Sequence, residues 1–239
     1  MLKQFSPRRV ARIIGALFLL TLVCGIIAQA FISERLIVFS DAATTANNIL
    51  SHRGLFQLGF TFYVIEMTCQ VAVAALWYVV LRPVSRPMAL TAAFIELSGS
   101  IVKSFARVLY IAPLWVLIPS ASGASPILRG FTAEQVESIA LVLLKVNDYG
   151  AATALAFFGF STFLNGYLIF RSTFLPRWLG VLAMISGLGW LTFLYPPLGY
   201  SAFMILALVA LAGSAATIFW LLVFGVNEEK WNQQASSHV

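Results

Sequence analysis

Apolar residues gather in six stretches along this chain, separated by short polar segments. Most of these stretches reach the roughly 20 residues that a helix needs to cross a bilayer. The fifth is shorter and leads into two consecutive prolines, Pro196 and Pro197. The stretches cover residues 11–32, 55–81, 89–116, 149–170, 179–194 and 202–224. The pattern predicts an all-α fold, a polytopic membrane bundle of six transmembrane helices.

The segments between the stretches predict two further short helices. Ser40 and Asp41 are candidate N-caps for the run that follows them. Thr132 stands three residues before Gln135, the spacing of a capping box. A straight helix over residues 132–171 would measure about 60 Å, twice the hydrocarbon thickness. We therefore expect a break or bend near residues 147–150. Both short helices are expected to be extracytoplasmic, either resting on the membrane interface or covering an outward-facing cavity.

Composition supports one membrane domain over residues 1–239. The chain is 60% hydrophobic and 10% charged, whereas soluble domains are about 45 to 50% apolar and about 25% charged. No hydrophilic segment is long enough for a second, soluble domain. Basic residues precede the first stretch, as in a signal peptide, but that stretch is longer than a signal core. We interpret it as a retained first span.

Positive charge is distributed unevenly around the spans, and this matters more than the net charge of +6. In a six-span arrangement one side carries Lys3, Arg8, Arg9, Arg12, Arg82, Arg86, Arg171, Arg177 and Lys230, and the other carries Arg35, Arg53 and Arg129. The positive-inside rule then places both termini in the cytoplasm. We expect the protein to lie in the inner membrane of the cell. The basic character is thereby explained without a nucleic-acid partner.

Cysteine and histidine usage argues against metal and nucleophile chemistry in the membrane. Cys24 and Cys69 fall inside predicted spans, where cysteine usually packs as a small apolar residue. His52 and His238 lie outside the spans and far apart in the chain. We therefore predict no metal, no cofactor and no catalytic residue, and we expect the protein not to be an enzyme.

Polar side chains inside the spans are the informative residues, because a charge at the centre of a span costs about 2.5 to 3.5 kcal/mol. Five of them in the third stretch fall within an arc of roughly 80° on one helix face. Three more share a face of the second stretch, and two stand where the fourth begins. The candidate ligand-binding or proton-relay residues are Tyr63, Glu66, Gln70, Glu96, Ser100, Lys103, Arg107, Tyr110, Asn147 and Asp148.

These groups have three interpretations. They form a buried ion-pair network that fixes helix order, or they line a water-filled cavity or ligand site, or the span boundaries are misplaced and some lie at the interface. The number of charged and amide groups exceeds what one ion pair needs, which favours a solvated pocket.

Helix geometry predicts two specific contacts. Arg107 and Asp148 stand at the same depth on consecutive antiparallel spans, so we expect them to pair near the outer boundary. Glu66, Glu96 and Lys103 are expected to form one cluster. Two carboxyl groups sharing one lysine would leave excess negative charge, so one of them is expected to hold a proton near neutral pH.

Several short strings along nearly the whole chain carry a resemblance to a known family. They are residues 11–15 (ARIIG), 36–38 (LIV) followed by Asp41, 80–84 (VLRPV), 147–150 (NDYG), 157–159 (FFG) and 166–172 (GYLIFRS), then Leu175-Pro176 and Leu179-Gly180. In this order and spacing the chain resembles the bacterial membrane family called domain of unknown function 4386. The resemblance implies a multi-span membrane protein and brings no activity, cofactor or partner.

Two functions from different classes fit these observations. The first is a small transporter or permease with an outward-facing polar pocket between spans two, three and four, coupled to protons through Glu66 or Glu96. The second is a non-catalytic membrane module that binds a lipid or a partner protein, with the buried charges structural. The expected partners are the lipid bilayer and a small-molecule or lipid ligand. An intramembrane enzyme with a serine next to Lys103 is a third, weaker interpretation.

Overall fold

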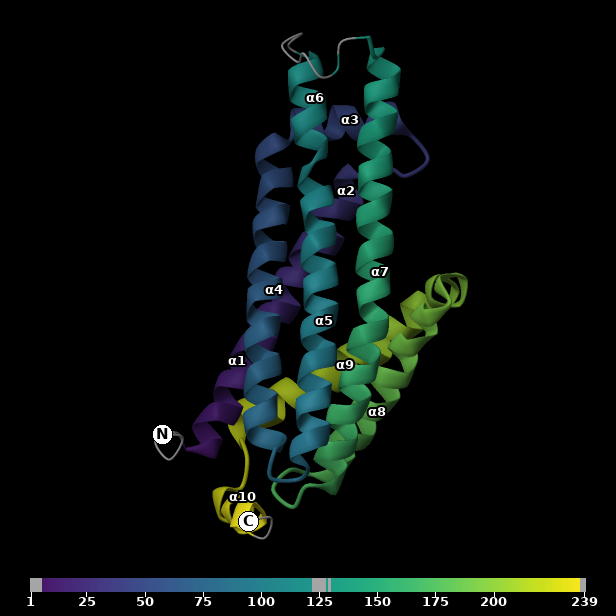
Figure 1. Cartoon of the computed structure of the whole chain (residues 1–239). Helices are drawn as coiled ribbons and strands as arrows, with labels where there is room; N and C mark the ends of the chain where they lie inside the picture. The colour runs from purple at the N-terminus through teal and green to yellow at the C-terminus, as the bar shows by residue number, and fades with distance from the viewer. Residues whose placement is uncertain (1–5, 122–127, 129, 237–239) are drawn as a thin grey trace. The chain divides into compact units, whose positions relative to one another are not determined.

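The computed structural model describes residues 6–121, 128 and 130–236, and every regular element in these residues is helical (Figure 1). Six helical stretches are long and apolar enough to cross a membrane. They are Pro7–Leu36, Arg53–Leu81, Arg86–Ile118, Ala133–Arg171, Arg177–Leu194 and Pro196–Val223. Each overlaps one predicted stretch, so the chain is a multi-pass α-helical membrane protein. Lys3, Arg129 and His238 lie outside the described residues.

Some of the spanning stretches are built from more than one helix. The first contains α1 (Pro7–Ile26), a π-helical segment η2 (Ile27–Ser33) and α2 (Glu34–Leu36). The third contains α5 (Arg86–Ile111) and α6 (Pro113–Ala121), and the fifth contains α8 (Arg177–Trp190) and a 3-10 segment η3 (Leu191–Leu194). The remaining helices are α3 (Ala42–Ser51), α4 (Arg53–Leu81), α7 (Ala133–Arg171), α9 (Pro196–Val223) and α10 (Glu228–Ser236).

The two predicted helix caps are confirmed. Asp41 precedes α3 and accepts hydrogen bonds from the backbone N–H of Thr44 at 2.9 Å and from its hydroxyl at 2.6 Å. These bonds stabilise the carboxylate and hold the pKa of Asp41 below its usual value. Before α7, the backbone N–H of Thr132 donates to Gln135 Oε1 at 2.9 Å, and the N–H of Gln135 donates to Thr132 Oγ1 at 3.3 Å.

Of the expected break or bend near residues 147–150, the break is wrong, and the bend stays a prediction. Helix α7 continues without interruption through 39 residues, about 58 Å at 1.5 Å per residue (Figure 1). The second short helix is therefore the beginning of α7 and not a separate element. The residues that suggested a break have packing roles. A Cβ atom built on Gly150 would lie 2.7 Å from Ala106 Cβ, so glycine permits close approach of α5 here.

Residue contacts divide the chain into two compact units. Unit 1 comprises Met1–Thr21, Thr68–Ile101 and Ala152–Val239, and unit 2 comprises Leu22–Met67 and Val102–Ala151. Helices α1, α4, α5 and α7 are continuous and contribute residues to both units. The single-domain organisation stays a prediction, and each unit is described by itself.

Unit 2 has its own apolar core, built around two buried tyrosines. Tyr110 on α5 stacks on Phe56 with ring centroids 4.5 Å apart, and it meets the Tyr63 ring edge-on at 5.2 Å. Helix α3 packs against α6 in this unit (Figure 1). The core also includes Ala28, Ile32, Leu36, Ala46, Ile49, Leu114, Leu117, Val136, Ala140 and Leu144.

Unit 1 is held together by packing of α8 on α9. Helix α10 also binds other elements of this unit. Helix α10 is anchored where Trp231 Nε1 donates to the carbonyl of Val80 at 2.9 Å. The backbone N–H of Asn227 donates to the carbonyl of Phe174 at 3.2 Å. Glu228 accepts from the hydroxyl of Ser6 and from the backbone N–H of Arg8.

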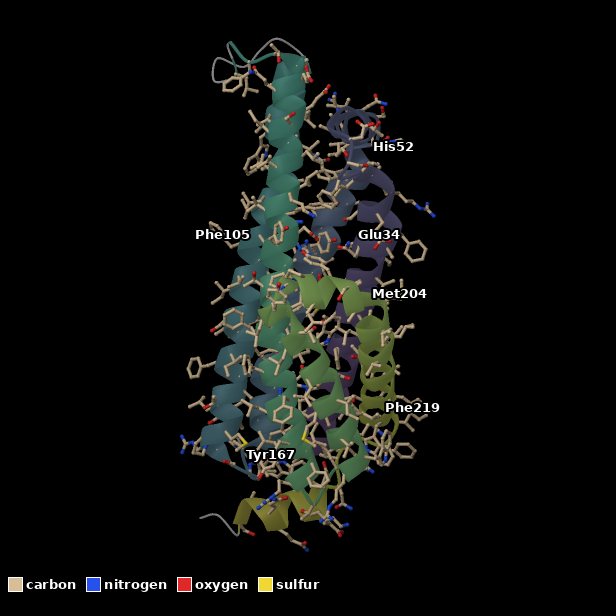
Figure 2. The ribbon with its side chains drawn as sticks, turned by 90° about the vertical axis from the view of Figure 1, so that its right-hand side faces the viewer. Glu34, His52, Phe105, Tyr167, Met204 and Phe219 are labelled. Carbon is tan, nitrogen blue, oxygen red and sulfur yellow. The ribbon has the colours of Figure 1, made fainter. Side chains whose placement is uncertain are left out.

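The outer faces of the spanning helices are apolar, as expected for helices in lipid. Phe105 of α5 is 74% exposed, and Met204 and Phe219 of α9 are also exposed. Figure 2 labels these three side chains, which point away from their helices. A soluble protein rarely exposes so many large apolar side chains together, whereas a bilayer solvates them.

Candidate functional site

A buried ion pair joins α4 to α5 inside unit 2. Lys103 Nζ lies 2.6 Å from Glu66 Oε1, and the two side chains are 13% and 9% exposed. Glycine at position 25 leaves room for the carboxylate, because a Cβ atom there would lie 3.2 Å from Glu66 Oε1. Opposite charges at this distance neutralise each other in a low-dielectric environment. This contact accounts for two members of the predicted three-residue cluster.

Arg107 lies one helical turn further along α5 and is only 5% exposed. Its Nη1 donates to Asn147 Oδ1 of α7 at 3.0 Å, and its guanidinium carbon lies 3.5 Å from the centre of the Tyr63 ring. The Nε donor of Arg107 has no hydrogen-bond partner. A buried donor without a partner is energetically unfavourable. Arg107 therefore presents an open, charged donor inside unit 2.

A network of hydroxyl and amide groups surrounds this arginine. Ser33 Oγ donates to Tyr110 Oη at 3.2 Å and lies 3.1 Å from Tyr63 Oη, which donates to Gln29 Oε1 at 2.7 Å. Gln29 and Ser33 both belong to the π-helical segment η2. The wider turn of a π-helix changes the direction in which its side chains point, and π-helical segments are frequent at functional sites.

These groups line a cavity of about 160 Å³. Its lining residues are Gln29, Ser33, Glu34, Ile37, Phe39, Tyr63, Arg107, Tyr110, Asn147, Asp148 and Ala151. Asp148 lies 3.5 Å from Lys145 Nζ in a half-exposed pair, and Lys145 lies over the Phe39 ring. The volume is sufficient for several waters or a small solute. Arg107 and Asp148 thus share one cavity, and their direct pairing stays a prediction.

Unit 1 contains a second polar group, centred on Glu96 of α5. Both carboxylate oxygens accept hydrogen bonds, one from Gln70 Nε2 of α4 and the other from Ser161 Oγ of α7. Ser100 Oγ donates to the backbone carbonyl of Glu96 at 3.0 Å. Glu96 is 6% exposed. The hydrogen-bond partners of Glu96 in this unit are thus an amide and a hydroxyl, which are neutral, whereas Glu66 faces a charged lysine.

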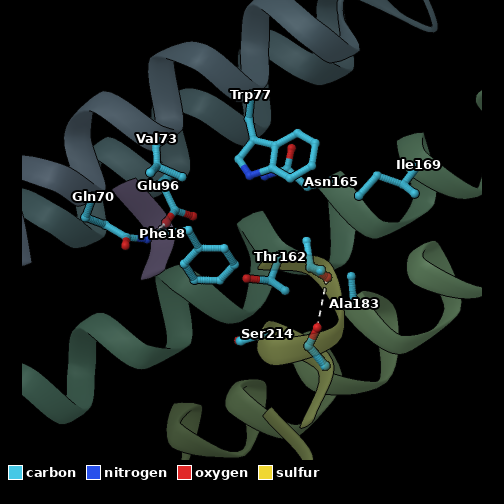
Figure 3. Close-up of a pocket in the computed structure, with 12 residues that line it drawn as sticks. Phe18, Gln70, Val73, Trp77, Glu96, Thr162, Asn165, Ile169, Ala183 and Ser214 are labelled. Carbon is cyan, nitrogen blue, oxygen red and sulfur yellow. Dashed lines mark hydrogen bonds between the residues drawn. The ribbon is translucent and has the colours of Figure 1, made fainter. Parts of the chain in front are cut away.

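A smaller cavity of about 80 Å³ opens beside Glu96. Figure 3 shows it with Phe18, Trp77 and Glu96 among the side chains around it. Its other lining residues are Gln70, Val73, Thr162, Asn165, Ile169, Ala183, Gly213, Ser214 and Thr217. Every lining residue belongs to unit 1. Across the described part of the chain, no three His, Cys, Asp or Glu residues gather in a way that suits a metal ion.

The structure thus distributes the predicted candidates over two sites. Tyr63, Arg107, Tyr110, Asn147 and Asp148 line the unit 2 cavity, and Glu66 and Lys103 pair within the same unit. Gln70, Glu96 and Ser100 belong to unit 1. Their roles as ligand-binding or proton-relay residues stay predictions, and so does the position of Glu96 relative to the Glu66–Lys103 pair.

Three participants were not among the predicted residues. Gln29 and Ser33 lie in the first span, and Ser161 lies in the fourth. Gln29 carried a usable signal, because an amide inside an apolar stretch needs a hydrogen-bond partner. A lone serine such as Ser161 carried none, because its hydroxyl can bond to its own helix backbone.

A family model matches residues 13–225, which covers most of the chain. The chain belongs to the family called domain of unknown function, DUF4386. This confirms the resemblance carried by the short strings of the sequence. The description of the DUF4386 family states no activity, so it supports the membrane architecture and assigns no role to either cavity.

One relative of this DUF4386 protein is an uncharacterized protein from Archaeoglobus fulgidus. The two are 26% identical over 121 residues, which cover 48% of this chain and 74% of the relative. No solved structure matches the chain. The argument for function therefore rests on the chemistry of the two sites.

Proposed function

We propose that this DUF4386 protein is a small transporter or permease whose solute site is the cavity beside Arg107. The observation that carries the proposal is the buried Nε donor of Arg107, which has no hydrogen-bond partner and belongs to a residue that lines a cavity within spanning helices. Ionisable residues inside spans commonly mark a solute or ion pathway. A solute that accepts from this guanidinium would satisfy the open donor.

The lining indicates the class of solute. A guanidinium presents donors in a planar fork that matches a carboxylate. Two acidic residues, Glu34 and Asp148, also line the cavity, and Asp148 pairs with Lys145. The Tyr63, Tyr110 and Ser33 hydroxyls offer neutral hydrogen bonds. The cavity volume of about 160 Å³ restricts the solute to a few heavy atoms. We therefore propose a small carboxylate-bearing solute.

The proposed setting is the inner membrane of a bacterial cell, with both termini in the cytoplasm. The asymmetry of lysine and arginine supports this orientation. Asn147 and Asp148 would then stand near the outer end of span four, and the cavity would open toward the outside. Coupling to protons through Glu66 or Glu96 belongs to the same proposal.

Uptake into proteoliposomes tests the transport function. We expect saturable uptake of at least one of three labelled probes, namely acetate, lactate and glycine. We expect Arg107→Gln to abolish it, because the amide carries no charge and has fewer donors. Arg53→Gln, at an exposed position on α4, is the matched control and should transport normally. Folded protein that shows no saturable uptake of any of the three probes would contradict the proposal.

The Glu66–Lys103 pair supports a second candidate function, a non-catalytic membrane module that binds a lipid or a partner protein. A pair that neutralises itself at 2.6 Å can serve helix packing alone. In that case the double variant Glu66→Gln with Lys103→Met would fold and keep its lipid or protein partner. Loss of solute uptake in this folded double variant would instead favour the transporter.

A further inference from the structure

The cavity beside Glu96 is lined by one carboxyl group and by no basic side chain. Glu96 is the one ionisable side chain among the twelve residues that line it, all of which are described. Gln70 and Ser161 supply hydrogen bonds to the carboxylate, but they supply no charge. A buried carboxylate in a spanning helix is costly unless a cation lies close to it. Burial therefore leaves Glu96 either protonated or beside a cation, which a ligand in the cavity would supply.

We propose that this unit 1 cavity binds a small organic ammonium ion. The carboxylate of Glu96 would receive the ammonium group, and the aromatic rings of Phe18 and Trp77 line the same space. Carboxylate and aromatic faces together are the chemistry that proteins use for amine cations, through charge pairing and cation–π attraction.

The lining combines oxygen-bearing side chains with apolar ones, and the apolar part favours an organic cation. Val73, Ile169 and Ala183 offer no ligand atoms for an alkali ion, but they suit a short alkyl group. The cavity volume of about 80 Å³ exceeds the space of a single coordinated ion and matches an ammonium group with about two or three carbons.

A neighbouring hydroxyl supports a polar occupant. Ser186 Oγ of α8 is buried without a hydrogen-bond partner. It lies beside Gly213, a lining residue, because a Cβ atom at Gly213 would be 2.8 Å from this oxygen. An orphaned hydroxyl next to the cavity is explained if a donor on the ligand, directly or through a water, reaches it.

Ligand-observed NMR on the detergent-solubilised full chain tests the site with three probes of similar size and different charge. We expect saturation transfer to ethylammonium, and none above empty micelles to ethanol or acetate. Glu96→Gln keeps the side-chain shape and removes the charge, so it should weaken ethylammonium binding at least tenfold. Glu134→Gln, which removes an exposed carboxylate in unit 2, is the matched control and should leave binding unchanged.

Several results would overturn the proposal. One is equal saturation transfer to ethanol, which would make the site a neutral apolar void. Another is displacement of ethylammonium by sodium or potassium chloride at equal concentration, which would make it an alkali-ion site. Absence of ethylammonium binding to the folded wild-type protein would also refute it. If Glu96→Gln does not fold, the three-probe series on the wild-type chain decides alone. Because the readout is binding in unit 1, its failure is distinguishable from failure of transport through the Arg107 site.

Discussion

Glu66 and Glu96 are both buried carboxylates on spanning helices, but their partners differ in kind. Glu66 faces a lysine, whereas Glu96 faces an amide and a hydroxyl. An ion pair is neutral as a whole and can remain inside a bundle without a ligand. The partners of Glu96 supply hydrogen bonds but no compensating charge. The two residues therefore have different uses, although their sequence contexts look alike.

Removing one partner of the ion pair should be more harmful than removing both. Lys103→Met leaves Glu66 charged and buried, so we expect a loss of about 3 to 5 kcal/mol in unfolding free energy. The double variant Glu66→Gln with Lys103→Met should recover much of it. Thermal unfolding in detergent measures both. The matched control is Lys145→Met, which breaks a half-exposed pair and should cost less than about 1 kcal/mol. Equal losses in the single and double variants would contradict this assignment.

Asp41 makes the stability of α3 depend on pH. Its pKa is lowered by the two bonds from Thr44, so the carboxylate stabilises the folded form. That contribution is complete above the usual pKa of aspartate, about 3.9, and is lost as pH falls through the lowered value. We expect Asp41→Ala to reduce amide protection at the start of α3 at neutral pH and to have no effect in strong acid. Hydrogen exchange of these amides measures the difference, and a pH-independent difference would argue against the cap.

Some residue contacts were predictable from sequence and others were not. The capping pairs before α3 and α7 depend on spacing within a few residues, so sequence reveals them. The partners of Arg107 and Glu96 come from other helices. Asn147 was named as a candidate, but nothing local shows that its oxygen, not Asp148, accepts from Arg107 Nη1. Ser161 is one of several small polar residues in its span, and only packing identifies it as a donor to Glu96.

At the scale of elements, helix α7 shows why length alone misled the prediction. A helix of 39 residues exceeds the hydrocarbon thickness, so a break was expected within the stretch from Asn147 to Gly150. Continuity is favoured because Gly150 and Asn147 are used in contacts with α5, at Ala106 and Arg107. Hydrophobic periodicity identifies where helices lie, but the reason for a glycine depends on the neighbouring helix.

Enlarging Gly150 should disturb unit 2. A side chain at this position would overlap Ala106, since even a Cβ atom would lie 2.7 Å from its Cβ. We expect Gly150→Val to destabilise the protein by about 1 to 3 kcal/mol through overpacking. Gly54→Ala on α4 is the control, because a Cβ atom there meets nothing within 4 Å. Thermal unfolding compares the two variants, and equal stability of both would show that α5 and α7 tolerate separation.

At the scale of the whole molecule, apolar length was sufficient to predict all six spanning stretches. Such stretches must satisfy their backbone hydrogen bonds internally, so the fold class follows directly. The division into two units was not predictable, because α1, α4, α5 and α7 show no change in composition where they pass from one unit to the other. Contacts between distant segments define those boundaries.

Membrane orientation follows from charge and is open to direct test. We expect single cysteines at positions 84 and 173 to resist a membrane-impermeant thiol reagent in intact cells, and cysteines at 41 and 134 to react. A background with Cys24→Ser and Cys69→Ser removes the native thiols. Permeabilised cells provide the control, since all four positions should then react. Ready labelling of position 84 or 173 from outside would reverse the orientation.

The docking of α10 has a consequence for biogenesis. Trp231 and Glu228 bind residues at the end of α4 and at the start of the first span, so unit 1 joins segments that leave the ribosome far apart in time. The start of the first helix must remain without its contact to Glu228 until that residue, 220 positions after Arg8, has been synthesised. Unit 1 is therefore completed only after synthesis has passed α10, and insertion factors have that whole interval in which to act on the unfinished bundle.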